Sequence, residues 1–337
     1  MAKKSEKKIK EEVNASGKVN PEGQAQEPKP DVTVEKKEEI TKRKLIEDIS
    51  KALKDEASEE DKKQGKETIK KYLQQSIDTY EISKNYNIVF LYDEGRMIES
   101  DADSIYTAVT SFPEKKPILL ILHSTGGNVE PAYLIGKLLH EYSTGPLNIV
   151  VPRRAKSAAT LVCCAADRIH MGSLSELGPI DPQLDRLPAL ALKNSIEHIA
   201  ELVTEFPQAT DLFAQYLSLT VKPIHIGYYE RIAKSAAQYA VRLLDQHKDN
   251  LEKTPGEIAG ILLYSYNDHS FVIDKQEAKN IFGGKVIQHN TKEYELGNAI
   301  YKELGFISLI AGVAGHDFYF NGSLIATEPG FIKRKKK

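Results

Sequence analysis

The chain has 337 residues, of which 41% are hydrophobic and 28% charged, with a formal net charge of −2 and two cysteines. This near-neutral balance gives no support for nucleic-acid binding, and we interpret the terminal "KRKKK" as a solubilising end. No apolar run approaches the roughly 18 residues that cross a bilayer, and no apolar core of a signal peptide follows the first lysines. The adjacent Cys163 and Cys164 are typical of a reducing compartment, since neighbouring cysteines on a helix diverge. We therefore expect a cytoplasmic protein without a membrane span.

The first 70 residues are dominated by charge. They hold 18 Lys or Arg and 17 Asp or Glu, and no aromatic residue. Such a segment buries too little apolar surface to offset chain entropy, so residues 1–70 are predicted to form a disordered or loosely helical charged arm. Within it, helical spacing predicts a helix over about 58–80 that leads into the fold. We expect a folded domain over 71–310 and a C-terminal extension with a basic tail over 311–337.

Three short apolar runs alternate with segments of helical spacing. The expected strands are 87–92, 117–122 and 147–152, and the expected helices are 99–110, 129–142 and the stretch from Ser157 to Asp167. This alternation is typical of parallel strands joined by crossover helices. Further short strands are expected in "DRIHMG" (167–172) and "KVIQH" (285–289).

Helical spacing dominates from 189 to 305, so the predicted α/β layer carries a large helical appendage. These helices offer more apolar faces than one small α/β layer can cover. Apolar faces of that kind indicate contacts between subunits, and we expect a homo-oligomer.

Two consecutive strand-to-helix turns carry the residues of a candidate site. In "HSTGGN" (123–128), Gly126 and Gly127 let the backbone turn sharply and approach a ligand closely. In the next unit Ser157 stands at a helix start, where it serves either as an N-cap or as a nucleophile. Both turns lie at the same end of a parallel sheet, where ligands of such sheets bind. A hydroxyl beside backbone N–H donors is the set that acyl transfer requires, which favours the nucleophile.

The stretches "LLILHSTGGNVEPAYLIGKLL" and "VVPRRAKSAATLVCCAADRIHMGSLSELGPIDPQ" resemble the Clp-fold serine proteases, and most closely the serine dehydrogenase proteinase family. That family is related to the ClpP peptidases and to signal peptide peptidase A. The resemblance covers about 85–305. It implies an α/β fold, a ClpP/crotonase-type superhelix of strand-helix units. It also implies an enzyme that hydrolyses peptide bonds in peptides or proteins and assembles into rings or dimers. No dinucleotide motif follows any strand, so no cofactor is expected.

Residue by residue, the resemblance makes Ser157 the nucleophile and the amides of Gly127 and Ala158 the oxyanion donors. It leaves the general base open among three residues. Asp181 stands near the place of the ClpP histidine, Lys193 is the lysine closest to the pattern of the peptidase A relatives, and His269 falls close to the third ClpP triad position. A histidine titrates near neutral pH, whereas a lysine must first be desolvated, so His269 is preferred.

Two other functional classes remain open at this point. The same fold serves crotonase-like acyl-CoA enzymes, which use the oxyanion donors without a serine nucleophile. A catalytically silent Clp-fold assembly partner is the other alternative, because the ClpP-type histidine is missing. The histidines occur singly and never at ligand spacing with cysteine or acid, so no metal site is expected.

Overall fold

The computed structural model describes residues 39–335 apart from 181, 182, 185, 186, 189, 190, 221, 222 and 267. Residues Glu39–Lys337 form one compact unit. Its helices are α1 (Lys42–Ala52), α2 (Glu59–Asp78), α3 (Glu99–Thr110), α4 (Val129–Tyr142), α5 (Ala158–Cys163), α6 (Ala191–Glu205), α7 (Thr210–Thr220), α8 (Pro223–Leu244), α9 (Pro255–Tyr264), α10 (Lys275–Phe282) and α11 (Lys292–Val313), with short 3₁₀ helices at Glu81–Asn85, Pro207–Ala209 and Asp245–Asn250.

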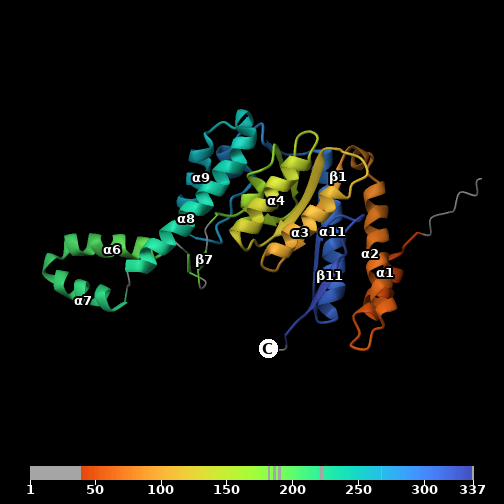
Figure 1. The fold of residues 1–337 in the computed structure, drawn as a ribbon, viewed down its shortest axis with the longest axis horizontal. Helices are drawn as coiled ribbons and strands as arrows, with labels where there is room; N and C mark the ends of the chain where they lie inside the picture. Colours follow the sequence, from red (N-terminus) through yellow and green to blue (C-terminus); the bar gives the residue numbers. More distant parts are fainter. Residues whose placement is uncertain are drawn as a thin grey trace, which may run out of the picture. The chain divides into compact units, whose positions relative to one another are not determined.

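A mixed sheet forms the centre of this unit (Figure 1). Its strand order is β11-β10-β1-β2-β3-β5-β9, and β4 and β6 continue it beyond β2. The strands are β1 (Asn87–Asp93), β2 (Ile118–Ser124), β3 (Asn148–Val151), β4 (Arg154–Ala155), β5 (Arg168–Met171), β6 (Glu176–Leu177), β9 (Ile287–Gln288), β10 (His316–Gly322) and β11 (Gly330–Lys333), and β7 (Gln183–Leu184) pairs separately with β8 (Leu187–Pro188). Strands β1, β2, β3, β5 and β9 are parallel, as expected from the alternation.

Side chains alternate between two cores because successive residues of a strand point to opposite faces of the sheet. Val89 and Leu91 of β1 belong to the core that also contains residues of α3, α4, α5, α8, α9 and α10. Phe90 and Tyr92 belong to the other core, with residues of α1, α2 and α11. Helices therefore cover both faces of the sheet, and the predicted mixed α/β architecture of the ClpP-like type is confirmed.

The predicted charged arm extended too far into the fold. Residues 1–38 lie outside the described residues, but α1 and α2 fall largely within the predicted arm and pack on the sheet. Leu45, Ile49, Ile69 and Leu73 are fully buried. The prediction gave the charge of the 70 residues more weight than their helical spacing, although an amphipathic helix needs only one apolar stripe to pack. The helix expected at 58–80 is confirmed as α2.

The predicted C-terminal extension is likewise part of the sheet. Strand β10 pairs antiparallel with β1, with Phe90 opposite Gly322, and its buried Phe318 and Phe320 join the second core. The alternation of these aromatic residues is a strand signal, but pairing with β1 across more than 200 residues cannot be inferred from local spacing.

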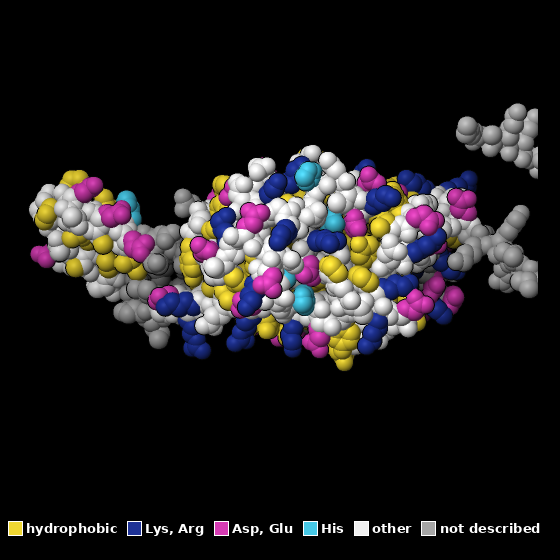
Figure 2. All heavy atoms as spheres, turned by 90° about the horizontal axis from the view of Figure 1, so that it is seen from above, with side chains coloured by type: hydrophobic (Ala, Val, Ile, Leu, Met, Phe, Trp, Pro, Cys, Tyr) yellow, Lys and Arg dark blue, Asp and Glu magenta, His cyan; other side chains and the backbone are white. Residues whose placement is uncertain are grey.

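The helical appendage expected after 189 is present, with α6 and α7 side by side at the start of α8 (Figure 1). Hydrophobic side chains gather on the α6–α7 hairpin in the space-filling view, whereas both charge signs are interspersed elsewhere on that face (Figure 2). Among the described residues, no helix is long and apolar enough to cross a membrane.

Candidate active site

The Gly126–Gly127 turn follows β2 and packs directly against the turn that contains Ser157. Gly126 has φ +96°, and a Cβ built there would lie 2.5 Å from the carbonyl oxygen of Lys156. Only glycine tolerates both the backbone conformation and the contact. The turn is held by Ser124, whose hydroxyl accepts a hydrogen bond from the Gly126 amide at 3.1 Å.

Ser157 lies at a strained strand-to-helix turn. Its backbone has φ 51° and ψ −119°, which a residue with a Cβ seldom adopts. Its side chain, although placed at the N-cap of α5, makes no capping hydrogen bond. Strain of this kind persists only where the surroundings enforce it, and it concentrates at functional sites. A serine on a sharp strand-to-helix turn is also how nucleophiles are presented in other hydrolase folds.

Hydrogen bonds on both sides of the Ser157 turn enforce this geometry. The amide of Lys156 donates to the carbonyl of Ser124 at 3.1 Å, which pairs β4 with the end of β2. On the other side, the amide of Gly178 donates to the carbonyl of Ala155 at 3.0 Å. The buried Thr160 hydroxyl also donates to this carbonyl at 2.8 Å. The backbone before and after Ser157 is thereby fixed.

The amides of Gly127 and Ala158 are available to a ligand. Gly127 forms a parallel bridge with Met97, in which Met97 bonds to the carbonyl of Gly126 and the amide of Asn128. In such a ladder the amide of Gly127 itself points away from Met97. Within the part of the chain that the structure describes, no hydrogen bond from either amide is found. The two expected oxyanion donors thus come from adjoining turns, and neither has a partner among the described residues.

The Lys156 side chain connects the Ser157 turn to a segment that is distant in sequence. Its ammonium donates to the carbonyls of Leu177 at 3.2 Å and Phe271 at 3.1 Å, and lies 3.6 Å from Glu176 Oε2. Burial lowers the pKa of Lys156, although Glu176 opposes the shift. These contacts bring the segment that contains His269 alongside the Ser157 turn, since His269 is two residues from Phe271. The sequence does not indicate this role of Lys156, because its partners are far away in sequence.

His123 and Ser124 have structural roles beside the site. His123 is buried between the rings of Tyr92 and Tyr301, and its Nε2 lies 3.1 Å from Glu94 Oε1. Burial lowers the pKa of His123, and the hydrogen bond with Glu94 only partly opposes this. Ser124 is 1% exposed and its hydroxyl is already the acceptor for Gly126. Neither side chain is accessible as a base or a nucleophile.

The geometry tests none of the three base candidates, and two of them are not described at all or not in their side chains. Asp181 lies outside the described residues, and Lys193 lies on α6 with a side chain that is not described. Among the described residues, no group of three or more His, Cys, Asp or Glu could hold a metal ion.

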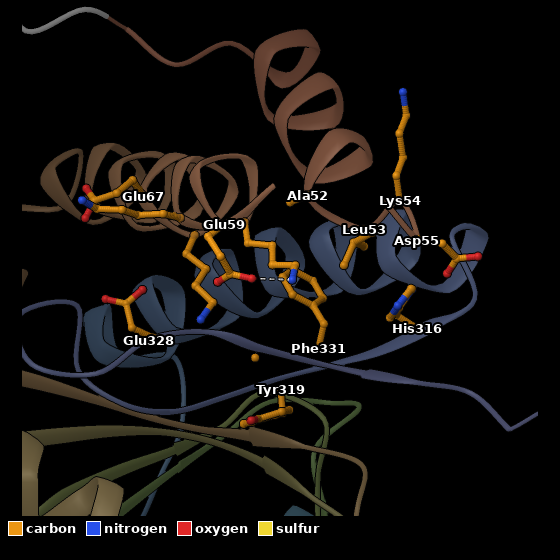
Figure 3. A pocket seen from close by; sticks show the side chains of 14 residues that line it. Ala52, Leu53, Lys54, Asp55, Glu59, Glu67, His316, Tyr319, Glu328 and Phe331 are labelled. Carbon is orange, nitrogen blue, oxygen red and sulfur yellow. Dashed lines mark hydrogen bonds and ion pairs between the residues drawn. The ribbon is translucent and has the colours of Figure 1, made fainter. Parts of the chain in front are cut away.

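Two cavities are relevant to the location of the site. One of about 530 Å³ lies between the Gly127 turn, the start of α4 and the middle of α8. A larger one, of about 710 Å³, lies between α1, α2, β10 and β11 (Figure 3). The larger cavity is lined by alternating acids and lysines, including the paired Glu59 and Lys62, and by neither turn of the candidate site. Size alone therefore does not identify the site.

Comparison with known proteins gave one family and uncharacterized relatives. ClpP-like SDH-type serine proteinases match residues 91–206. Two uncharacterized proteins of Methanocaldococcus jannaschii are 39% and 31% identical over 97 and 105 residues, or 29% and 31% of this chain. The matches span 34% and 36% of those relatives, about a third of their length. The resemblance drawn from the motifs is thus confirmed for residues 91–206, which hold both turns of the candidate site and match the ClpP-like SDH-type serine proteinase family.

Proposed function

We propose that the protein is a serine peptidase that cleaves peptide bonds with Ser157 as its nucleophile. The observation that carries this proposal is the backbone of Ser157, held at φ 51° while its hydroxyl caps nothing. An N-cap serine needs an extended backbone and a hydrogen bond to the second or third amide of the helix. Ser157 has neither, so helix capping does not account for a serine here.

In the proposed reaction the Ser157 hydroxyl attacks the scissile carbonyl and its proton passes to a general base, for which we propose His269. The oxyanion accepts hydrogen bonds from the amides of Gly127 and Ala158, which bond to no other group in the described part of the chain. Collapse of this intermediate expels the amine, which takes the proton from the base, and water then hydrolyses the acyl-serine. The approach of the Phe271 carbonyl to Lys156 supports His269, since it brings that loop to the nucleophile turn.

A reducing compartment such as the cytoplasm suits this proposal, because the thiols of Cys163 and Cys164 are buried and free. Both lie in the core that packs α5 against the sheet.

Labelling with a fluorophosphonate probe tests the proposal. The wild-type chain should be labelled at Ser157 and should cleave unstructured protein substrates, and Ser157→Ala should lose both properties. Ser111→Ala is the matched control, since Ser111 is an exposed residue at the end of α3, outside both turns. Retention of label in Ser157→Ala would refute the proposal. Acyl-CoA thioester turnover by Ser157→Ala would instead favour the crotonase-like alternative.

A further inference from the structure

The cavity of about 530 Å³ beside Gly127 is lined by charged and apolar side chains that have no role in the proposed reaction. One wall consists of Arg96, Gly127 and the first residues of α4, and the other wall is α8. Ile232, Ala236 and Tyr239 give α8 an apolar surface there. A volume in this range is typical of sites that enclose a ligand group. Gly127 belongs both to this lining and to the proposed oxyanion hole. A substrate side chain that occupies the cavity therefore belongs to a residue within two positions of the cleaved bond.

Two exposed arginines, Arg96 and Arg231, line this cavity from its two walls. Arg96 comes from the segment after β1, and its Nε donates to Asn128 Oδ1 at 2.8 Å. Arg231 comes from α8. Among the residues that the structure describes, neither arginine forms an ion pair with an acid of this chain. Because no acid of the described chain pairs with them, the two arginines have N–H donors left for the carboxylate of a ligand. A guanidinium binds a carboxylate through two parallel hydrogen bonds.

One acid opposes this charge. Glu130, in the first turn of α4, also lines the cavity, so the lining has two positive charges and one negative. The excess is positive, and the Nε of Arg96 is fixed by Asn128, which orients its guanidinium. A lysine side chain of the substrate would meet two cations and one anion, and a neutral side chain would supply no charged partner for either guanidinium group.

We infer that this cavity selects peptides with a glutamate or aspartate within two residues of the cleaved bond. The inference rests on the proposed peptidase activity, which it deepens by naming a substrate class. Arg96 and Arg231 bind the carboxylate, and Glu130 limits the strength of that binding.

Paired peptides test the inference. Quenched fluorescent peptides carry Glu or Gln at each of the two positions on either side of the bond, with all other residues equal. The wild type should cleave one Glu peptide about tenfold faster in kcat/KM than its Gln counterpart, the size expected of partly screened charge pairs. The double variant Arg96→Gln/Arg231→Gln should reduce this ratio to about one, and Glu130→Gln should increase it. Lys234→Gln is the control, because Lys234 is on α8 but pairs with Glu230 outside the cavity.

A binding measurement separates this inference from the proposed function. Fluorescence anisotropy with the Ser157→Ala chain should show tighter binding of the labelled Glu peptide than of the Gln peptide, and the difference should disappear in the double arginine variant. Cleavage that depends on Ser157 but shows no Glu preference at any position would overturn the inference and leave the proposed function intact. Preferential binding of the Glu peptide without any cleavage would overturn the function alone, and equal binding of both peptides would overturn the inference.

Discussion

Replacing Ser157 with glycine or alanine separates backbone strain from helix capping. A backbone at φ 51° and ψ −119° costs a residue with a Cβ on the order of 1–3 kcal/mol. Glycine removes most of this strain but loses about 0.5–1 kcal/mol through the larger entropy of its unfolded chain. Alanine keeps the Cβ and therefore the strain. We expect the free energy of unfolding of Ser157→Gly to be about 1 kcal/mol higher than that of the wild type. That of Ser157→Ala should equal the wild-type value.

Urea unfolding followed by circular dichroism measures these differences, and thermal scans provide a second readout. At roughly 2–4 °C per kcal/mol for a chain of this size, the glycine variant should melt about 2–4 °C above the wild type. Both variants should be inactive and unlabelled by fluorophosphonate. Greater stability with lost chemistry is the expected signature of strain kept for function.

A capping role predicts instead that both variants are less stable than the wild type. If the Ser157 hydroxyl stabilised α5, alanine would lower the free energy of unfolding by about 1 kcal/mol and glycine by a few tenths. An alanine variant about 1 kcal/mol below the wild type would therefore refute the strain argument, as would a glycine variant no more stable than the wild type.

Three further predictions concern the base, pH and assembly. His269→Gln should lower kcat by about 100-fold or more, whereas Lys193→Met should leave it unchanged; the reverse result in steady-state assays would exchange their roles. Burial lowers the pKa of His170 to about 4, so the unfolded chain binds a proton below about pH 6.5 that the folded chain does not. The contribution of His170 to stability should be constant above that pH and should fall on acidification towards pH 4 by up to about 1.4 kcal/mol per unit. His170→Gln should remove this contribution from the pH dependence in urea titrations at several pH values, while the buried His123 and His247, whose pKa values are also lowered, keep theirs. Light scattering at micromolar concentration should give an oligomer mass, because large apolar side chains on α7 are exposed, namely Leu212, Tyr216 and Leu219; a monomer mass would contradict the expected assembly.

The parallel part of the fold was predictable because its signals are local. The helices expected at 99–110 and 129–142 agree with α3 and α4 at both ends, since polar or glycine residues interrupt the apolar spacing there. Helix α1 and strand β10 were missed for a different reason. Each has a weak local signal, but it is stabilised by packing on distant elements, as Leu45 is in the second core, and that packing cannot be inferred from local spacing.

The candidate site shows the same division. The sequence predicted that Gly126, Gly127 and Ser157 would meet, because consecutive parallel units place their turns at one edge of the sheet. It did not predict the contact of Lys156 with Phe271, which joins residues 115 positions apart. Nor did it predict Arg231 opposite Gly127, because the path of α8 depends on how the appendage folds back.

The two turns act as one structural unit, and this has a consequence for the proposed chemistry. The Lys156 amide bonds to Ser124, and the Lys156 carbonyl lies so close to Gly126 that any Cβ there would collide with it. Displacement of either turn therefore displaces the other, so the hydroxyl of Ser157 and the proposed oxyanion donors cannot move independently. Donors that are fixed before substrate binds need no reorganisation when charge develops. The strain at Ser157 and the requirement for glycine at 126 thus follow from the same close contact.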